Sequence, residues 1–253
     1  MAELYSGATS EFVQHTKQNE IAERLRGAFF DHYGWQPPHS EVRSWRNSLK
    51  ALSNAIELGG LLDHGLLLEY QLPLTSKRLD AMITGHDRDG RKAAVIVELK
   101  QWSEDVAPSR VADMVTVRYG RGLKETLHPS AQVGQYRQYL ADAHETFHDG
   151  DVRLRACAYL HDFIHDDQSE LLASRHANIL GVYPLFAGDR VTELVGTSPE
   201  GVDDAIRNGI ARAAETLRHL DWFEVTEIRG HLVDGRIEHV QVGMKVGFRL
   251  EDA

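Results

Sequence analysis

The sequence has almost none of the features that mark secreted or membrane proteins. Cysteine occurs once in 253 residues, at Cys157, so the chain forms no internal disulfide and suits a reducing compartment. No run of 18 or more apolar residues occurs, and residues 1–12 lack the basic and apolar regions of a signal peptide. We therefore predict a cytoplasmic protein with no membrane partner.

An excess of positive charge is also missing. The formal net charge is −10, and residues 188–253 contribute 13 acidic and 8 basic side chains, so each of the two parts carries −5. This balance excludes a protein that holds nucleic acid through its whole surface, although a local basic track remains open. The hydrophobic fraction of 42% and the length are sufficient for one large domain or two modest ones.

Residues 1–187 combine helical and strand-like patterns. Residues 41–58 follow Ser40, a predicted N-cap, and carry apolar side chains at helical spacing. A second helix is expected over residues 130–147, capped by Ser130, and residues 103–128 are expected to be less regular. The strand-like runs are residues 66–74, 78–87, 93–102, 154–160 and 178–186. Together they predict an α/β (α+β) domain with a mixed sheet flanked by helices.

Residues 188–253 have a different rhythm. A strand over residues 190–196 precedes a helix that starts near Pro199, and two long alternating runs follow at 222–233 and 237–250. The predicted order is β-α-β-β. One helix on three strands gives a thin core, so we expect this module to bury apolar surface against other copies.

Several short motifs of this C-terminal module occur in a fixed order. They are VGTSPE (195–200), LDWFEV (220–225), EIRG (227–230), VQV (240–242) and KVGFRLE (245–251). In these motifs and their spacing the module resembles the dodecin family. The resemblance implies a homo-dodecamer that binds a flavin (FMN, riboflavin or FAD) for storage or quenching rather than turnover.

The resemblance also assigns roles to individual residues. Trp222 matches the tryptophan that stacks on the isoalloxazine ring, and a flat electron-poor ring suits an indole. Gln241 matches the glutamine that hydrogen-bonds the polar edge of the flavin, which needs both a donor and an acceptor. Arg249 matches a basic residue near the cofactor phosphate or tail, and Arg229 is a second candidate nearby.

In the N-terminal part, charged residues gather on two neighbouring strand-like runs. Asp80 lies in one run, and Glu98-Leu99-Lys100 ends the next, where alternation places Glu98 and Lys100 on the same face. A hairpin would bring Asp80 beside them. Asp80, Glu98 and the Leu99 carbonyl could hold Mg²⁺ or Mn²⁺, while Lys100 could orient or help deprotonate a water and offset phosphate charge.

This arrangement resembles the PD-(D/E)XK superfamily, which implies a restriction-endonuclease-like fold and metal-dependent nuclease activity. Gln132 and Tyr136 match its QxxxY element, and four-residue spacing places both on one helix face. Leu79 stands where the superfamily has proline. An upstream helix acid is also implied, and Glu41 is the candidate, with Glu57 and Glu69 as alternatives.

Over residues 40–187 the chain looks like the N-terminal region of bacterial Schlafen-like helicase proteins. The helicase part is absent, and no GxxxxGK[ST] phosphate-binding loop occurs. We therefore expect a nuclease-like domain at 1–187 and a dodecin-like domain at 188–253. The predicted function is hydrolysis of nucleic acid, DNA in preference to RNA, on a dodecameric scaffold. A flavin-storing or flavin-sensing dodecamer with an inactive nucleic-acid- or partner-binding domain, and an engineered fusion, are the alternatives.

Overall fold

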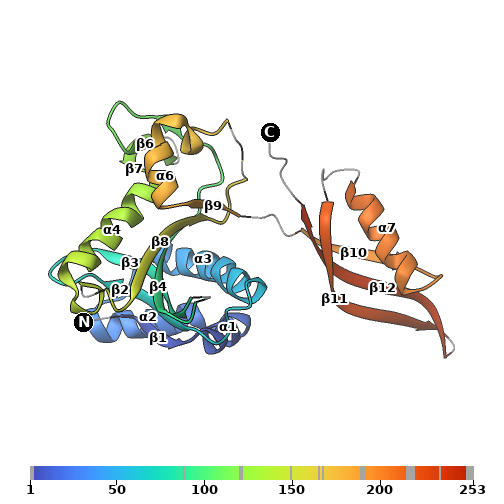
Figure 1. Ribbon diagram of the computed structural model, residues 1–253. Helices are drawn as coiled ribbons and strands as arrows, with labels where there is room; N and C mark the ends of the chain where they lie inside the picture. The colour runs from blue at the N-terminus through green and yellow to red at the C-terminus, as the bar shows by residue number, and fades with distance from the viewer. Residues whose placement is uncertain are drawn as a thin grey trace. The chain divides into compact units, whose positions relative to one another are not determined.

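The computed structural model contains two compact units, Met1–Gly188 and Asp189–Ala253 (Figure 1). It describes residues 3–87, 89–119, 122–148, 150–164, 166, 168–188, 192–214, 220–233 and 235–248. Each unit has its own sheet and its own core. No helix in these ranges combines the length and the apolar character that crossing a membrane requires.

The first unit is built on a six-stranded mixed sheet with the order β1-β2-β3-β4-β8-β9. Its strands are β1 (Tyr5–Ala8), β2 (Gly65–Gln71), β3 (Arg78–His86), β4 (Lys92–Lys100), β8 (Arg153–Leu160) and β9 (Leu185–Ala187). Strands β1 to β4 pair antiparallel, whereas β4, β8 and β9 run parallel. Strand β4 is apolar on both faces because helices cover the sheet on both sides.

Helices α1 (Thr9–Lys17), α2 (Ile21–Tyr33) and α3 (His39–Leu58) pack on one face of this sheet, and α4 (Pro129–Ala143) packs on the other (Figure 1). The α3 face is closed by Trp45, Leu49, Leu52 and Ile56, which are all buried. The α4 face is closed by Val133, Tyr136 and Leu140 against β3, β4 and β8. The expected mixed sheet flanked by helices is therefore present.

Residues 103–128 are more regular than expected. They form a three-stranded antiparallel sheet of β5 (Ala107–Pro108), β6 (Met114–Tyr119) and β7 (Gly122–Leu127). Val115 and Val117 of β6 are buried together with Leu160, Phe163 and Leu171. This packing comes from distant parts of the chain, so the local pattern did not reveal it.

Three local expectations were wrong. Residues 178–186 are not one strand, because helix α6 (Ala177–Val182) precedes the short β9. Helix α3 begins at His39 after Pro38, which gives no side-chain cap, so Ser40 lies inside the helix. Helix α4 is capped by His128, whose side chain accepts a hydrogen bond from the Ser130 N–H.

The remaining short helices are α5 (Glu145–His148) and the 3₁₀ turns Glu170–Leu172 and Ser174–His176.

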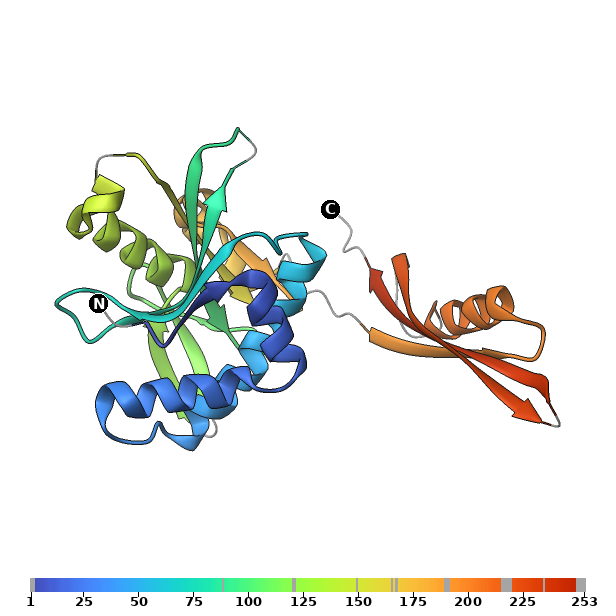
Figure 2. The ribbon, with the colours of Figure 1, turned by 90° about the horizontal axis from the view of Figure 1, so that it is seen from below.

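The second unit has the expected β-α-β-β order. It comprises β10 (Thr192–Ser198), α7 (Val202–Ala214), β11 (Leu220–Val233) and β12 (Arg236–Phe248), and the antiparallel sheet order is β10-β12-β11. Figure 2 shows α7 lying along one face of this sheet, where Ala205 contacts a stripe of buried β12 residues. That stripe consists of Val240, Val242, Met244 and Val246.

Candidate active site and the C-terminal domain

The candidate active site lies at the C-terminal end of β4. In the antiparallel pair of β3 and β4, Ala81 lies opposite Val97, and one step further along the strands are Asp80 and Glu98. The Leu99 N–H donates a hydrogen bond of 2.7 Å to Asp80 Oδ2, and Lys100 Nζ donates one of 2.6 Å to Glu98 Oε1. The hairpin therefore brings the two carboxylates and the ammonium group together.

Helix α4 adds two side chains to this cluster. Gln132 Nε2 donates to Glu98 Oε1 at 2.6 Å and to the Tyr136 hydroxyl oxygen at 3.0 Å. The two residues are one helical turn apart, so both face β4. Gln132 thereby links the helix to the carboxylate of Glu98 and restricts its rotation.

Burial sets the electrostatics of the cluster. The pKa of Glu98 is raised to about 8, first by burial and then by the negative charge of Asp80. Burial also raises the pKa of Asp80, against the lowering effect of Lys100. Burial alone would lower the pKa of Lys100, but Glu98 and Asp80 outweigh it and raise that pKa overall. When both carboxylates are ionised, their negative charge exceeds the single positive charge of Lys100.

This donor set fits a hard divalent cation. Glu98 Oε2 is buried, and the structure gives it no hydrogen-bond partner among the described residues. Within that part of the chain no group of three or more His, Cys, Asp or Glu side chains is arranged around a common metal position. A cation here would rest on Asp80, Glu98, backbone oxygen and water, which is how Mg²⁺ is often held.

The upstream acids take different places. Glu41, the expected helix acid, pairs with Arg78 and lines a pocket of 340 Å³ together with Asp80, Leu99 and residues of α3. Glu57 lies elsewhere and forms a 2.6 Å ion pair with Lys17. Glu41 therefore borders the site, and Glu57 does not.

Glu69, which was only an alternative candidate for the acid, also borders the candidate active site. It lines the same pocket, and its side chain accepts a 2.7 Å hydrogen bond from Trp45 Nε1. Its pKa is raised to about 8 by burial and then by Asp80, while Arg78 lies 3.5 Å from its carboxylate. Its φ of 52° is in the left-handed region, which is uncommon for glutamate. The sequence signal that could have identified Glu69 was an acidic residue within the largely apolar run of residues 66–72.

In the second unit, Gln241 of β12 is exposed and lies opposite Arg229 of β11, whose guanidinium donates to Glu227 at 2.7 Å. The backbone of Trp222 pairs with Gly247, six residues along β12 from Gln241. Six residues of strand span about 20 Å, so one protomer does not gather Trp222 and Gln241 closely. Arg249 and the side chain of Trp222 lie outside the described residues.

Comparison with known proteins identifies this second unit. Residues 189–251 match the family model for dodecin. A dodecin from Thermus thermophilus is 58% identical over 60 residues, which cover 24% of this chain and 87% of that protein. Among solved structures, dodecin from Streptomyces davaonensis shows 71% identity and covers 25% of this chain and 93% of its own, with a TM-score of 0.24. Dodecin from Streptomyces coelicolor shows 64% identity over 25% and 91%, also with a TM-score of 0.24. Through its residues 189–251 the chain belongs to the dodecin family.

Proposed function

We propose that the first unit is a metal-dependent nuclease displayed on the dodecin assembly. The observation that carries this proposal is the convergence of Asp80, Glu98 and Lys100 with Gln132 at one end of β4. Two carboxylates supply the oxygen ligands of a divalent cation, and a lysine beside them can face a phosphate. Phosphodiester hydrolysis needs both kinds of group in one place.

The chain's own residues would divide the work as follows. Asp80 and Glu98 hold the cation, with the Leu99 carbonyl as a further ligand, and Gln132 keeps Glu98 oriented. Because its pKa is raised, Lys100 stays protonated, which favours orienting the attacking water and offsetting phosphate charge over removing a proton. Bound Mg²⁺ or Mn²⁺ would supply charge stabilisation and a more acidic water. Tyr136, whose pKa is raised by burial, acts as a neutral hydroxyl.

The dodecin domain would assemble twelve copies and bind flavin through Trp222 and Gln241, with Arg249 and Arg229 near its tail. Because Trp222 and Gln241 are far apart along the sheet of one protomer, a single flavin would take them from neighbouring subunits. The preferred substrate of the proposed nuclease is DNA.

A fluorescence titration tests the flavin site. We expect the wild type and Gln36→Ala to quench flavin fluorescence, and Trp222→Ala not to quench it. Equal quenching by both variants would show that Trp222 is not part of the flavin site.

A flavin store or sensor carrying a silent first unit is the second candidate. It is favoured by one observation: Glu98 Oε1 already accepts hydrogen bonds from both Lys100 and Gln132. A carboxylate with one oxygen held by two donors in this way can remain without a metal, although its other oxygen is then unpaired. The two candidates differ in whether divalent cations enter the site.

Cleavage of labelled single- and double-stranded DNA and RNA with Mg²⁺ or Mn²⁺ separates the candidates. We expect cleavage by the wild type, with a loss of at least about 100-fold in Glu98→Gln and Lys100→Ala, as removing a transition-state group typically costs. Glu57→Gln is the matched control, since it removes a carboxylate from α3 away from the site. An assembled, folded wild type that cleaves none of the four substrates would favour the silent domain.

A further inference from the structure

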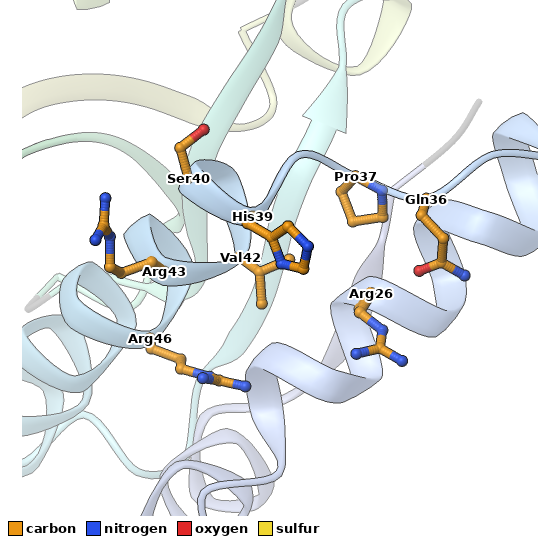
Figure 3. A pocket seen from close by; sticks show the side chains of 8 residues that line it. All are labelled: Arg26, Gln36, Pro37, His39, Ser40, Val42, Arg43 and Arg46. Atoms are coloured by element: carbon orange, nitrogen blue, oxygen red, sulfur yellow. The ribbon is translucent and has the colours of Figure 1, made fainter.

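A second pocket, of 610 Å³, lies between α2 and the first turns of α3 (Figure 3). Three arginines line it: Arg26 from α2, and Arg43 and Arg46 from α3. His39, Ser40 and Gln36 supply further polar groups. The volume lies within the range of sites that take small ligands or parts of larger ones. Such a concentration of arginine contrasts with the net charge of −5 on residues 1–187.

The two pockets share the N-terminal part of α3. Glu41, Ser44 and Ser48 border the candidate active site, whereas His39, Arg43 and Arg46 border the arginine-lined pocket. Residues three or four apart lie on one helix face, so these two sets occupy different faces of the first three turns of α3. A helix with its side chains is about 10–12 Å across. The pockets are therefore about one helix width apart.

Positive charge in this pocket exceeds what the surrounding carboxylates neutralise. Glu23 of α2 contacts both Arg26, at 3.1 Å, and Arg46, at 2.7 Å. Arg43 forms no ion pair with any residue that the structure describes. Two guanidinium groups thus share one carboxylate while the third has none, and all three arginines are exposed to solvent. The guanidinium fork matches the oxygens of phosphate and carboxylate ligands.

The beginning of α3 strengthens this preference for anions. His39 and Ser40 form its first turn and line the pocket, and Pro38 before them provides no side-chain cap. The first N–H groups of a helix carry partial positive charge and lack partners within the helix.

We propose that this pocket binds the backbone phosphates of the nucleic-acid strand whose cleaved bond lies in the candidate active site. The inference rests on the proposed nuclease function and adds a second contact to it. At the axial rise of 3.4 Å per nucleotide in one strand of a duplex, one helix width corresponds to about three nucleotides. The strand would therefore cross the start of α3, with the scissile phosphate on one side and the held phosphates on the other.

Equilibrium binding without metal tests the pocket independently of cleavage. The probe is a fluorescein-labelled single strand of ten nucleotides, and anisotropy is measured with the full chain at several salt concentrations in EDTA. We expect Arg43→Glu/Arg46→Glu to bind at least about tenfold more weakly, with a salt slope smaller by roughly 1 to 2, because each lost phosphate contact lowers that slope by about 1. Arg24→Glu, on a different face of α2 and paired with Glu20, is the matched control and should change binding less than about twofold.

Three results would overturn the proposal. The first is unchanged affinity in the double variant, and the second is an equal loss in Arg24→Glu, which would indicate net charge alone. The third is tight binding of inorganic phosphate or a nucleoside monophosphate with no binding of the oligonucleotide, which would assign the pocket to a small ligand. The same measurement on Glu98→Gln keeps the two proposals apart. Absence of cleavage with intact, arginine-dependent binding would contradict the nuclease and leave the phosphate pocket standing.

Discussion

Glu69 combines three unfavourable conditions at one position. Its backbone is left-handed, its carboxylate is buried, and Asp80 carries a like charge nearby. Strain at a left-handed non-glycine residue costs on the order of 1–3 kcal/mol, and such residues cluster at functional sites. Trp45 and Arg78 hold its carboxylate in place from the α3 side of the sheet. The arrangement suits a residue that supports the ligands of a cation.

We therefore expect Glu69→Gln to lower nuclease activity about 10–100-fold, the usual cost of losing a group that supports metal ligands. The variant should also need a higher Mn²⁺ concentration for half-maximal cleavage, since glutamine cannot ionise when the cation binds, whereas Glu69 can. Titration of activity against metal concentration measures both effects. Glu41→Gln, which loses only its contact with Arg78, should shift the metal requirement less. A larger shift in Glu41→Gln than in Glu69→Gln would indicate that Glu41, and not Glu69, supports the metal ligands.

The residues that the sequence predicted correctly as neighbours are those linked by local patterns. Glu98 and Lys100 share a face through strand alternation, Gln132 and Tyr136 through helical spacing, and Asp80 joins them through a hairpin. The choice between Glu41, Glu57 and Glu69 was different. It depended on how α3 crosses the sheet, which no local pattern records. Glu41 was preferred, while both Glu41 and Glu69 line the pocket with Asp80, and it is the pKa of Glu69 that Asp80 raises.

At the scale of elements, α4 depends on a histidine for its start. His128 Nδ1 accepts from the Ser130 N–H at 3.1 Å, and its Nε2 lies 2.9 Å from the Leu171 carbonyl oxygen. Both bonds require the neutral imidazole with its proton on Nε2. Burial lowers the pKa of His128 to about 4. A proton on Nδ1 would remove the cap from the helix that carries Gln132.

This pKa predicts a stability change with pH. Between pH 6.5 and 4 the unfolded chain takes up a proton at His128 that the folded chain does not, so stability is fully present above pH 6.5 and falls as the pH drops. At 1.36 kcal/mol per unit the loss is at most roughly 3 kcal/mol. Thermal unfolding at pH 7 and pH 5 measures this effect. His128→Asn, which keeps a capping side chain, should be less stable than the wild type at pH 7. Its stability should, however, fall clearly less between pH 7 and pH 5. His176, whose pKa burial also lowers, accounts for a residual slope. An unchanged slope in the variant would contradict this assignment.

In the second unit, the docking of α7 depends on a glycine. A Cβ on Gly196 of β10 would lie 1.8 Å from the Ala205 carbonyl oxygen, so helix and strand approach at a distance that no side chain permits. We expect Gly196→Ala to displace α7, to cost at least about 3 kcal/mol as severe overpacking does, and to prevent assembly. Size-exclusion chromatography measures that loss. Gly27→Ala, in α2 with nothing within 4 Å of the new Cβ, should stabilise by up to about 1 kcal/mol. Intact assembly of Gly196→Ala would show that α7 can move without loss.

Elements that are held by contacts with residues distant in the sequence were not predicted. The β5–β7 sheet is fixed by packing of Val115 and Val117 on Phe163 and Leu171, far along the chain. The run of residues 178–186 was assigned to a strand because it is apolar, yet its first part folds as α6. Tyr183, at the end of α6, packs where Gly134 of α4 leaves space. Helices and strands with long periodic patterns, such as α3 and β12, were in contrast predicted to within a few residues.

At the scale of the whole molecule, the second unit exposes apolar side chains that a single copy cannot bury. They are Val195, Phe223, Val225, Ile228, Leu232, Val233 and Ile237. Exposed apolar side chains in this number on so small a unit indicate surface that binds other subunits. In the proposed function, assembly through this surface would join many first units, each with one proposed nucleic-acid site, on one particle. Linked sites can raise the overall affinity by 10² to 10⁴ without any new contact, when one strand reaches several of them.

Affinity for nucleic acid should therefore depend on strand length in the assembly but not in the separated protomer. Ile228→Lys places a charge at a position that is 57% exposed in one protomer, so the fold should persist while assembly fails. We expect this variant to bind a ten-nucleotide strand like the wild type, yet a strand of about 100 nucleotides at least roughly 100-fold more weakly. Leu123→Lys adds the same charge at an exposed site of the first unit and should keep the length dependence. Mass photometry gives the oligomeric state and anisotropy the affinities. If the dissociated variant still favours long strands as the wild type does, the length dependence belongs to the single protomer and the assembly serves flavin alone.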